Sequence, residues 1–176
     1  MIQQHATWVE RLQRREASPY PEIWNILDQV KDPEIPVISL WELGVLCDVS
    51  YESGNYVISI TPTYSGCPAM ETMRSDVIST LAQAGINEVR VRTQLAPAWT
   101  TQNLSPAGKA KLQEYGIAPP DPEACGSCGL TPDAGIKCPR CGSLDTQRIS
   151  EFGSTACKAL FQCQQCLEPF DYFKHI

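Results

Sequence analysis

The stretch CPRCGSLDTQRISEFGSTACKALFQCQQC, residues 138–166, holds two C-x-x-C pairs. The first pair is Cys138 and Cys141, the second is Cys163 and Cys166, and 21 residues (142–162) separate them. That spacing is close to the about 15 to 20 residues typical of zinc ribbons. Four sulfurs carried on two hairpins can converge on one ion. The sequence therefore predicts a tetrathiolate metal site in a C-terminal zinc-ribbon domain with rubredoxin-like knuckles.

The identity of the metal is left open by the ligands alone. We expect structural Zn²⁺, and an iron–sulfur cluster is the alternative because it takes the same four thiolates. Further potential ligands flank the ribbon pairs, namely Cys125, Cys128, Cys157 and His175. They form a second metal site, exchange with the ribbon ligands, or are ordinary side chains near the ribbon.

The nine cysteines are unevenly spread, since only Cys47 and Cys67 precede residue 125. Secretory disulfides would be another explanation for so many. Residues 1–18, however, contain several charged side chains and lack the apolar segment of a signal peptide. No run of about 18 apolar residues predicts a membrane span. We therefore expect a cytosolic protein whose thiols are reduced.

The charge balance argues against a nucleic-acid partner. The net charge of −6 arises in residues 1–124, which hold 15 acidic and 9 basic side chains, while the remaining residues hold 5 of each. Binding to phosphates requires a surplus of Lys and Arg, and four thiolates around a divalent ion would add about −2 to the ribbon.

Residues 19–116 carry the pattern of a small α+β domain of the order helix, strand, strand, helix, strand. We expect a helix over 21–31, a hairpin with strands over 45–51 and 56–60, a helix over 68–84 and a strand over 89–95. A short helix over 105–116 follows. Cys47 falls on the apolar face of its strand, which favours a packing role.

The domain organisation expected from these patterns has four parts. Residues 1–18 are an N-terminal extension, 19–116 the α+β domain, 117–124 a proline-rich linker and 125–176 the cysteine-rich ribbon domain. The linker assignment rests on three prolines within it, which stiffen an extended chain.

The segment PTYSGCPA, residues 62–69, places a cysteine where a helix is expected to begin. Pro68 suits the first helical position and puts Cys67 at the N-cap, where backbone N–H groups would lower the pKa of its thiol below about 8.5. Such a thiolate binds a metal, holds a cluster transiently or attacks an electrophile. The simpler interpretation is a cap or a packed apolar group. The histidines are His5 and His175, near the two termini, which disfavours a Cys–His catalytic pair.

Several segments of this chain, among them the one around Cys67, resemble the D-subunit family (PaaD, also PaaJ) of the bacterial phenylacetyl-CoA epoxidase system. In the first domain the matching segments are DPEIPV (32–37), Asp48-Val49, PTYSGCPA (62–69) and PAWTT (97–101). The first two alone indicate only the broader SufT-like iron–sulfur assembly family. The tail segments SEFGSTACKAL (150–160) and EPFDYFK (168–174) narrow the resemblance to the D subunits.

This resemblance implies a non-catalytic accessory factor of aerobic phenylacetate catabolism that acts in maturation of the oxygenase complex. Its client would be the reductase component, which carries an iron–sulfur centre, or the oxygenase component, which carries a di-iron site. By position, Cys67 would be the functional thiol with Asp32 and Glu34 as the acidic motif nearby, although carboxylates in such a proline-containing loop are commonly only solvated.

Three functions follow as hypotheses. The first is the maturation factor, and a dimer in which Cys67 of two chains holds one metal or cluster would fit it. The second is a structural or adapter subunit that stays bound to the oxygenase, with both domains as interaction surfaces. The third and weakest is an enzyme that uses Cys67 as a nucleophile, because a histidine partner is missing from the nearby sequence.

Overall fold

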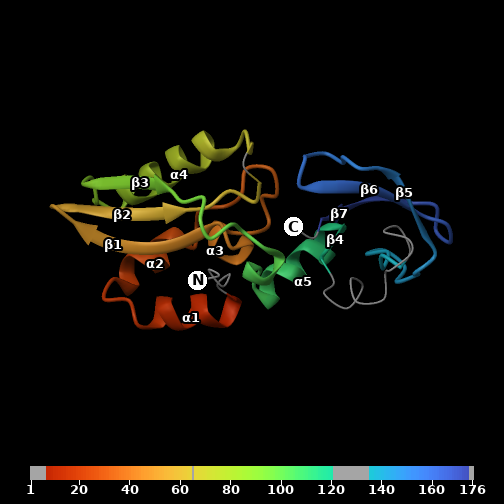
Figure 1. Ribbon diagram of the computed structural model, residues 1–176, viewed down its shortest axis with the longest axis horizontal. Coiled ribbons are helices and arrows are strands. Elements are labelled where there is room, and N and C mark those ends of the chain that lie inside the picture. The colour runs from red at the N-terminus through yellow and green to blue at the C-terminus, as the bar shows by residue number, and fades with distance from the viewer. Residues whose placement is uncertain (1–6, 65, 121–134, 175–176) are drawn as a thin grey trace. The chain divides into compact units, whose positions relative to one another are not determined.

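The computed structural model describes residues 7–64, 66–120 and 135–174 and divides the chain into two compact units, residues 1–108 and 109–176 (Figure 1). Each unit contains its own β-sheet, one of three strands and one of four. The predicted α+β class with a C-terminal ribbon is confirmed. The division between Gly108 and Lys109 lies before the expected linker at 117–124, and the first two residues of that linker form a strand.

The first unit follows the predicted order of α2, β1, β2, α4 and β3, with two further helices (Figure 1). Its elements are α1 (Trp8–Glu16), α2 (Pro21–Leu27), α3 (Leu40–Leu43), β1 (Leu46–Glu52), β2 (Asn55–Ile60), α4 (Met70–Gln83), β3 (Val89–Thr93) and the 3₁₀ turn η1 (Thr101–Asn103). The sheet order is β1-β2-β3, with β1 and β2 antiparallel and β2 and β3 parallel.

The hairpin of β1 and β2 forms as predicted because its turn suits the twist of the strands. Ser53 and Gly54 both have positive φ, 50° and 85°, as the type I′ turn of a two-residue hairpin requires. A bulge lies between Leu46 and Asp48, so the strict alternation expected along β1 is interrupted there and Cys47 is only half-buried.

The core of the first unit comes from the apolar stripes of two helices. Met73, Val77 and Leu81 of α4 are buried at intervals of four residues. In α2 the buried residues are Ile23, Trp24 and Leu27. The prediction that this helix reaches residue 31 is wrong. After its C-cap Asp28 the chain leaves the helix through turns closed by i→i−3 hydrogen bonds, from Gln29 N–H to the Ile26 carbonyl at 3.2 Å and from Val30 N–H to the Leu27 carbonyl at 3.1 Å.

Two helices of this unit were not predicted from the sequence, although each begins with a capping box. The expected extension contains α1, whose N-cap Thr7 and N3 residue Glu10 exchange hydrogen bonds. Ser39 and Glu42 do the same for α3. The S/T-x-x-E spacing was available in the sequence and marks a helix start.

The second unit begins within α5 (Pro106–Tyr115), which confirms the predicted short helix. Its strands are β4 (Ile117–Ala118), β5 (Thr146–Ser150), β6 (Lys158–Cys163) and β7 (Pro169–Phe173), in the order β4-β7-β6-β5. β4 pairs with β7 in parallel and the other pairs are antiparallel. Its core is small, with Phe161 stacked on Phe170 at a centroid distance of 5.9 Å, and two of the ribbon cysteines belong to it.

No helix among the described residues is both long and apolar enough to cross a membrane.

Candidate metal centre

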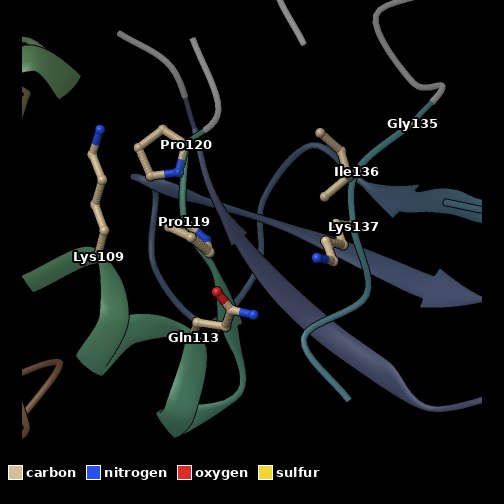
Figure 2. A pocket seen from close by; sticks show the side chains of 7 residues that line it. All are labelled: Lys109, Gln113, Pro119, Pro120, Gly135, Ile136 and Lys137. Atoms are coloured by element: carbon tan, nitrogen blue, oxygen red, sulfur yellow. The ribbon is translucent and has the colours of Figure 1, made fainter. Parts of the chain in front are cut away.

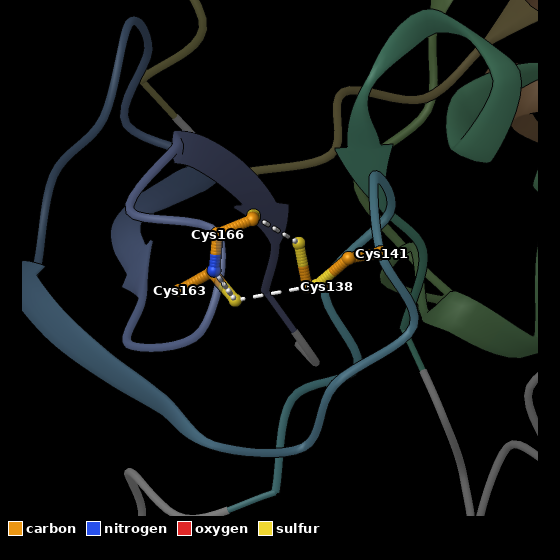
Figure 3. Close-up of side chains that lie close together, drawn as sticks. All are labelled: Cys138, Cys141, Cys163 and Cys166. Carbon is orange, nitrogen blue, oxygen red and sulfur yellow. Dashed lines mark hydrogen bonds between the residues drawn. The ribbon is translucent and has the colours of Figure 1, made fainter.

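The four predicted ribbon cysteines come together in the second unit (Figure 3). Their sulfur atoms all lie within 4.8 Å of one another. Cys138 Sγ is 3.8 Å from Cys166 Sγ, and Cys141 Sγ is 3.5 Å from Cys163 Sγ. Sulfurs bound at about 2.3 Å to one tetrahedral ion are separated by about 3.8 Å. The cluster is therefore sized for a single metal ion.

Two knuckles of similar construction hold these sulfurs. In the first, Cys138 N–H donates to the Ser143 carbonyl and Gly142 N–H donates back to the Cys138 carbonyl, both at 2.9 Å. In the second, Cys163 N–H donates to the Glu168 carbonyl at 3.1 Å. The residue after each second cysteine has positive φ, 78° at Gly142 and 62° at Leu167, which turns the chain back toward the sheet.

The environment of the sulfurs is closed on the core side. Cys138 and Cys163 are buried, at 1% and 0% exposure, while Cys166 is half-buried and Cys141 is exposed. With four sulfurs already present, a tetrahedral ion has no open position for a substrate. The geometry is that of a structural site rather than a catalytic one.

Backbone donors prepare one of the four thiols for ionisation. The N–H of Cys166 reaches Cys163 Sγ at 3.4 Å. That bond, together with the N–H of Gln165, outweighs burial and lowers the pKa of Cys163 to about 6. At Cys166 the N–H of Glu168 acts in the same direction, but burial and the three neighbouring thiols prevail and raise its pKa to about 12. A divalent cation bound by these sulfurs would lower the pKa of Cys166 as well, because it stabilises every thiolate that it binds.

Of the remaining predicted ligands, the structure describes Cys157 alone, and Cys157 does not join this group. Cys125, Cys128 and His175 lie outside the described residues. Cys157 is buried, and its sulfur lies 3.0 Å from Thr155 Oγ1. Across residues 7–64, 66–120 and 135–174, the ribbon cysteines are the one set of three or more His, Cys, Asp or Glu side chains close enough to share an ion.

The expectation that Cys67 caps a helix is wrong. The helix α4 begins at Met70 with Ala69 as its N-cap, and the first α-helical bond runs from Met73 N–H to the Ala69 carbonyl at 2.9 Å. Pro68 and Ala69 lie in a turn before the helix, so Cys67 precedes the N-cap by two positions. Its own N–H donates to the Tyr64 carbonyl at 3.2 Å, and its side chain is half-buried.

The acidic motif is built into the loop that follows α2. Asp32 is 3% exposed, and its Oδ1 accepts hydrogen bonds from Glu34 N–H at 2.9 Å and Ile35 N–H at 2.8 Å. This carboxylate therefore organises its own loop, which the interpretation as simple loop solvation did not anticipate. Glu34 is half-buried in the same loop. Asp32 also lines a hollow of about 370 Å³ together with Asp76 of α4.

The tail segments that carried the family resemblance meet in one polar network. Asp171 on β7 accepts from Ser154 Oγ at 2.7 Å and lies 3.8 Å from the ammonium of the buried Lys158. Gly153 lies so close to Asp171 Oδ1 that a Cβ there would collide with it. These residues fix the β5–β6 loop against β7, so their pattern is explained by the architecture of the ribbon.

Comparison with known proteins assigns a family model to each part of the chain. Residues 123–174 match the model described as "PaaD zinc beta ribbon domain", and residues 21–92 match "Iron-sulfur cluster assembly protein". A protein of Escherichia coli (strain K12), named as the putative D subunit of 1,2-phenylacetyl-CoA epoxidase, is 48% identical over 155 residues, which cover 88% of this chain and 92% of that protein.

Two solved structures are similar to a part of this chain. A domain of unknown function from Bacillus anthracis is 27% identical, covering 59% of this chain and 95% of its own, with a TM-score of 0.48. A conserved hypothetical protein from Thermotoga maritima is 26% identical, covering 54% of this chain and 94% of its own, with a TM-score of 0.45.

Proposed function

The chain belongs to the family of 1,2-phenylacetyl-CoA epoxidase D subunits, and on that premise we propose that it is a maturation factor for the multicomponent epoxidase of aerobic phenylacetate catabolism. It assists assembly of the iron–sulfur centre of the reductase component or of the di-iron centre of the oxygenase component. The observation that carries this proposal is the match of residues 21–92 to an iron–sulfur cluster assembly family, combined with a separate metal centre in the second unit.

The proposal divides the work between the two units. The ribbon holds one structural Zn²⁺ through Cys138, Cys141, Cys163 and Cys166, which supplies folding free energy that its small core lacks. Iron is the alternative occupant because it takes the same four thiolates. The first unit binds iron or a cluster transiently and contributes no ligand to the ribbon site.

Within the first unit, Cys67 is the proposed functional thiol and Asp32 and Glu34 belong to the same functional region. Cys67 is half-buried rather than enclosed, so an incoming metal or cluster can reach it. A single thiolate offers too few ligands to retain iron, which suits transfer better than storage. Cys67 of a second chain would add a ligand, so a homodimer is part of this proposal. The cytosol, which keeps thiols reduced, is the compartment that fits.

The test measures how much iron the reductase and oxygenase components contain when they are produced with variants of this chain. The reductase and oxygenase components are produced together with the wild-type chain, with Cys67→Ser or with Cys47→Ser as a matched cysteine control. A maturation factor predicts that Cys67→Ser lowers iron in one component, and that Cys47→Ser does not. The proposal would be contradicted if the iron content of each component were the same with the wild-type chain and with both variants.

The second candidate is an adapter subunit without a role in metal transfer. It is favoured by the name of the Escherichia coli relative, which describes a subunit of the epoxidase. An adapter predicts a stable stoichiometric complex with the oxygenase and an innocuous Cys67→Ser substitution. Gel filtration of the co-purified components distinguishes it from a factor that leaves after loading its client. Neither candidate gives the chain a catalytic role of its own.

A further inference from the structure

The second unit contains a hollow that the metal centre does not use, of about 280 Å³ (Figure 2). We propose that this hollow is a docking site for an acidic peptide segment of a partner protein, anchored by one apolar side chain. Both a maturation factor and an adapter must recognise a partner, so the failure of this inference would leave the proposed function standing.

The walls of the hollow come from three separate segments that the fold holds in place. Lys109 and Gln113 project from α5 at i and i+4, which puts them on one face of that helix. Pro119 and Pro120 follow directly on β4, whose pairing with β7 fixes them. Because the walls are already ordered, little conformational entropy is lost when a ligand binds.

The opposite wall is tied to the ribbon. Ile136 is 8% exposed and belongs to the ribbon core, and its carbonyl accepts from Thr146 Oγ1 at 2.8 Å. Lys137 follows it and leads directly into the first metal-binding knuckle at Cys138. Figure 2 shows Ile136 and Lys137 facing the prolines from the other side of the hollow.

The chemistry of this lining selects the ligand. Two lysines contribute positive charge, and no carboxylate is among the described residues that line the hollow. The remaining surface is largely apolar, from the prolines and Ile136. An acidic segment complements the two ammonium groups, and an apolar side chain complements the floor between them.

The volume favours a peptide anchor over a small-molecule cofactor. Pockets that enclose a cofactor or drug-sized ligand measure about 300–1,000 Å³. At about 280 Å³ this hollow falls at the lower limit. It accommodates one side chain with its flanking backbone, while the carboxylates of the peptide stay at the rim beside the lysines.

Selection from a phage-displayed library of random nonapeptides tests this inference on the full, metal-loaded chain. We expect enrichment of sequences with one large apolar residue flanked by Asp or Glu. A synthetic peptide of the enriched sequence should bind more weakly as salt is raised, because exposed charge pairs are screened. Its affinity should fall roughly tenfold or more in the double variant Lys109→Glu/Lys137→Glu.

Two controls keep the test specific. The double variant Arg14→Glu/Arg90→Glu changes the net charge equally at exposed positions of the first unit and should leave the affinity unchanged. The variant Gln113→Trp fills the hollow from α5 without changing charge and should also abolish binding. The inference is overturned if no acidic sequence is enriched, or if the enriched peptide binds the Lys109→Glu/Lys137→Glu and Gln113→Trp variants as well as the wild type.

Discussion

At the scale of single residues, Arg11 is the least expected feature of the first unit. Its guanidinium is buried at 2% exposure and donates to the carbonyls of Trp41 at 3.1 Å, Leu46 at 2.8 Å and Asn103 at 2.5 Å. It also lies 4.3 Å from the ring centroid of Trp41. One side chain thereby joins α1, α3, the start of β1 and the turn η1.

Arg11→Met should therefore destabilise the first unit by about 3 kcal/mol or more, because three buried carbonyls lose a charged donor. Urea denaturation followed by tryptophan fluorescence measures this, since Trp8, Trp24, Trp41 and Trp99 all lie in that unit. Arg14→Met, at an exposed position on the same helix, should change stability by less than about 0.5 kcal/mol. Equal effects of the two substitutions would refute this role of Arg11.

The other cysteine of the first unit, Cys47, should be nearly inert. Burial raises the pKa of its thiol to about 11, although the nearby Arg11 partly opposes this. Only the thiolate is alkylated, and its fraction falls as pH drops below that value. At pH 8 the alkylation of Cys47 by iodoacetamide should be roughly 100-fold slower than that of an unperturbed thiol, and it should accelerate as the pH rises toward 11. Peptide mapping by mass spectrometry measures it, and rapid labelling of Cys47 at pH 8 would count against the structure.

At the scale of elements, the close approach of α3 to η1 depends on a glycine. Gly44 ends α3 with φ of 86°, and an added Cβ there would lie 2.6 Å from Asn103 Cβ. Gly54 in the hairpin turn has nearly the same φ, 85°, but has nothing within 4 Å of an added Cβ. The two positions therefore share backbone strain and differ in steric clash.

Gly54→Ala should cost about 1 kcal/mol from the left-handed backbone alone. Gly44→Ala should cost about 2–4 kcal/mol, because the clash with Asn103 is added. Urea denaturation of both variants, read by tryptophan fluorescence, gives the difference directly. If both variants lose the same stability, the packing of α3 against η1 is not as described.

The elements that could be predicted from the sequence are those marked by a periodic pattern of apolar residues or by a fixed spacing of cysteines. The four-residue spacing of Met73, Val77 and Leu81 defines α4, and the cysteine pairs define the knuckles of the metal centre. The start of α4 was misplaced because a turn at Pro68 and Ala69 precedes it, and proline suits that turn as well as a first helical turn.

Other features have no signal in a periodic pattern. The strand β4 is two residues long and pairs with β7, which is distant in sequence. Two residues are too few to show a periodic pattern, so Ile117 and Ala118 were assigned to a linker. The burial of Arg11 depends on three carbonyls from different elements, whereas an arginine in a polar helix normally lies at the surface. The network at Asp171 likewise combines residues from two tail segments that sequence alone could only match to a family.

At the scale of the whole molecule, the two units differ in their need for metal. The proposed ribbon metal is bound by four cysteines as thiolates, so acid should displace it as the thiolates take up protons. Chelation, lowering the pH or Cys138→Ser should therefore unfold the ribbon, as judged by loss of dispersion in its NMR resonances, with about one metal ion per chain lost.

The first unit should be unaffected by that loss, because its core has no metal ligand in common with the ribbon. Its urea midpoint, read by tryptophan fluorescence, should stay the same after chelation at neutral pH. A midpoint that falls together with metal content would show that the units are not independent in stability, and that the ribbon metal is more than a local structural element.

The maturation role is tested most directly by measuring iron and acid-labile sulfide in the reductase and oxygenase components. Both components are purified without oxygen from cells that also produce this chain. Cells with the wild-type chain or Cys47→Ser should yield fully loaded components. Cells with Cys67→Ser, at equal levels of folded protein, should yield one component with at least several-fold less iron. Full loading of both components with Cys67→Ser would contradict the maturation role and leave the adapter subunit as the function that the family and the structure support.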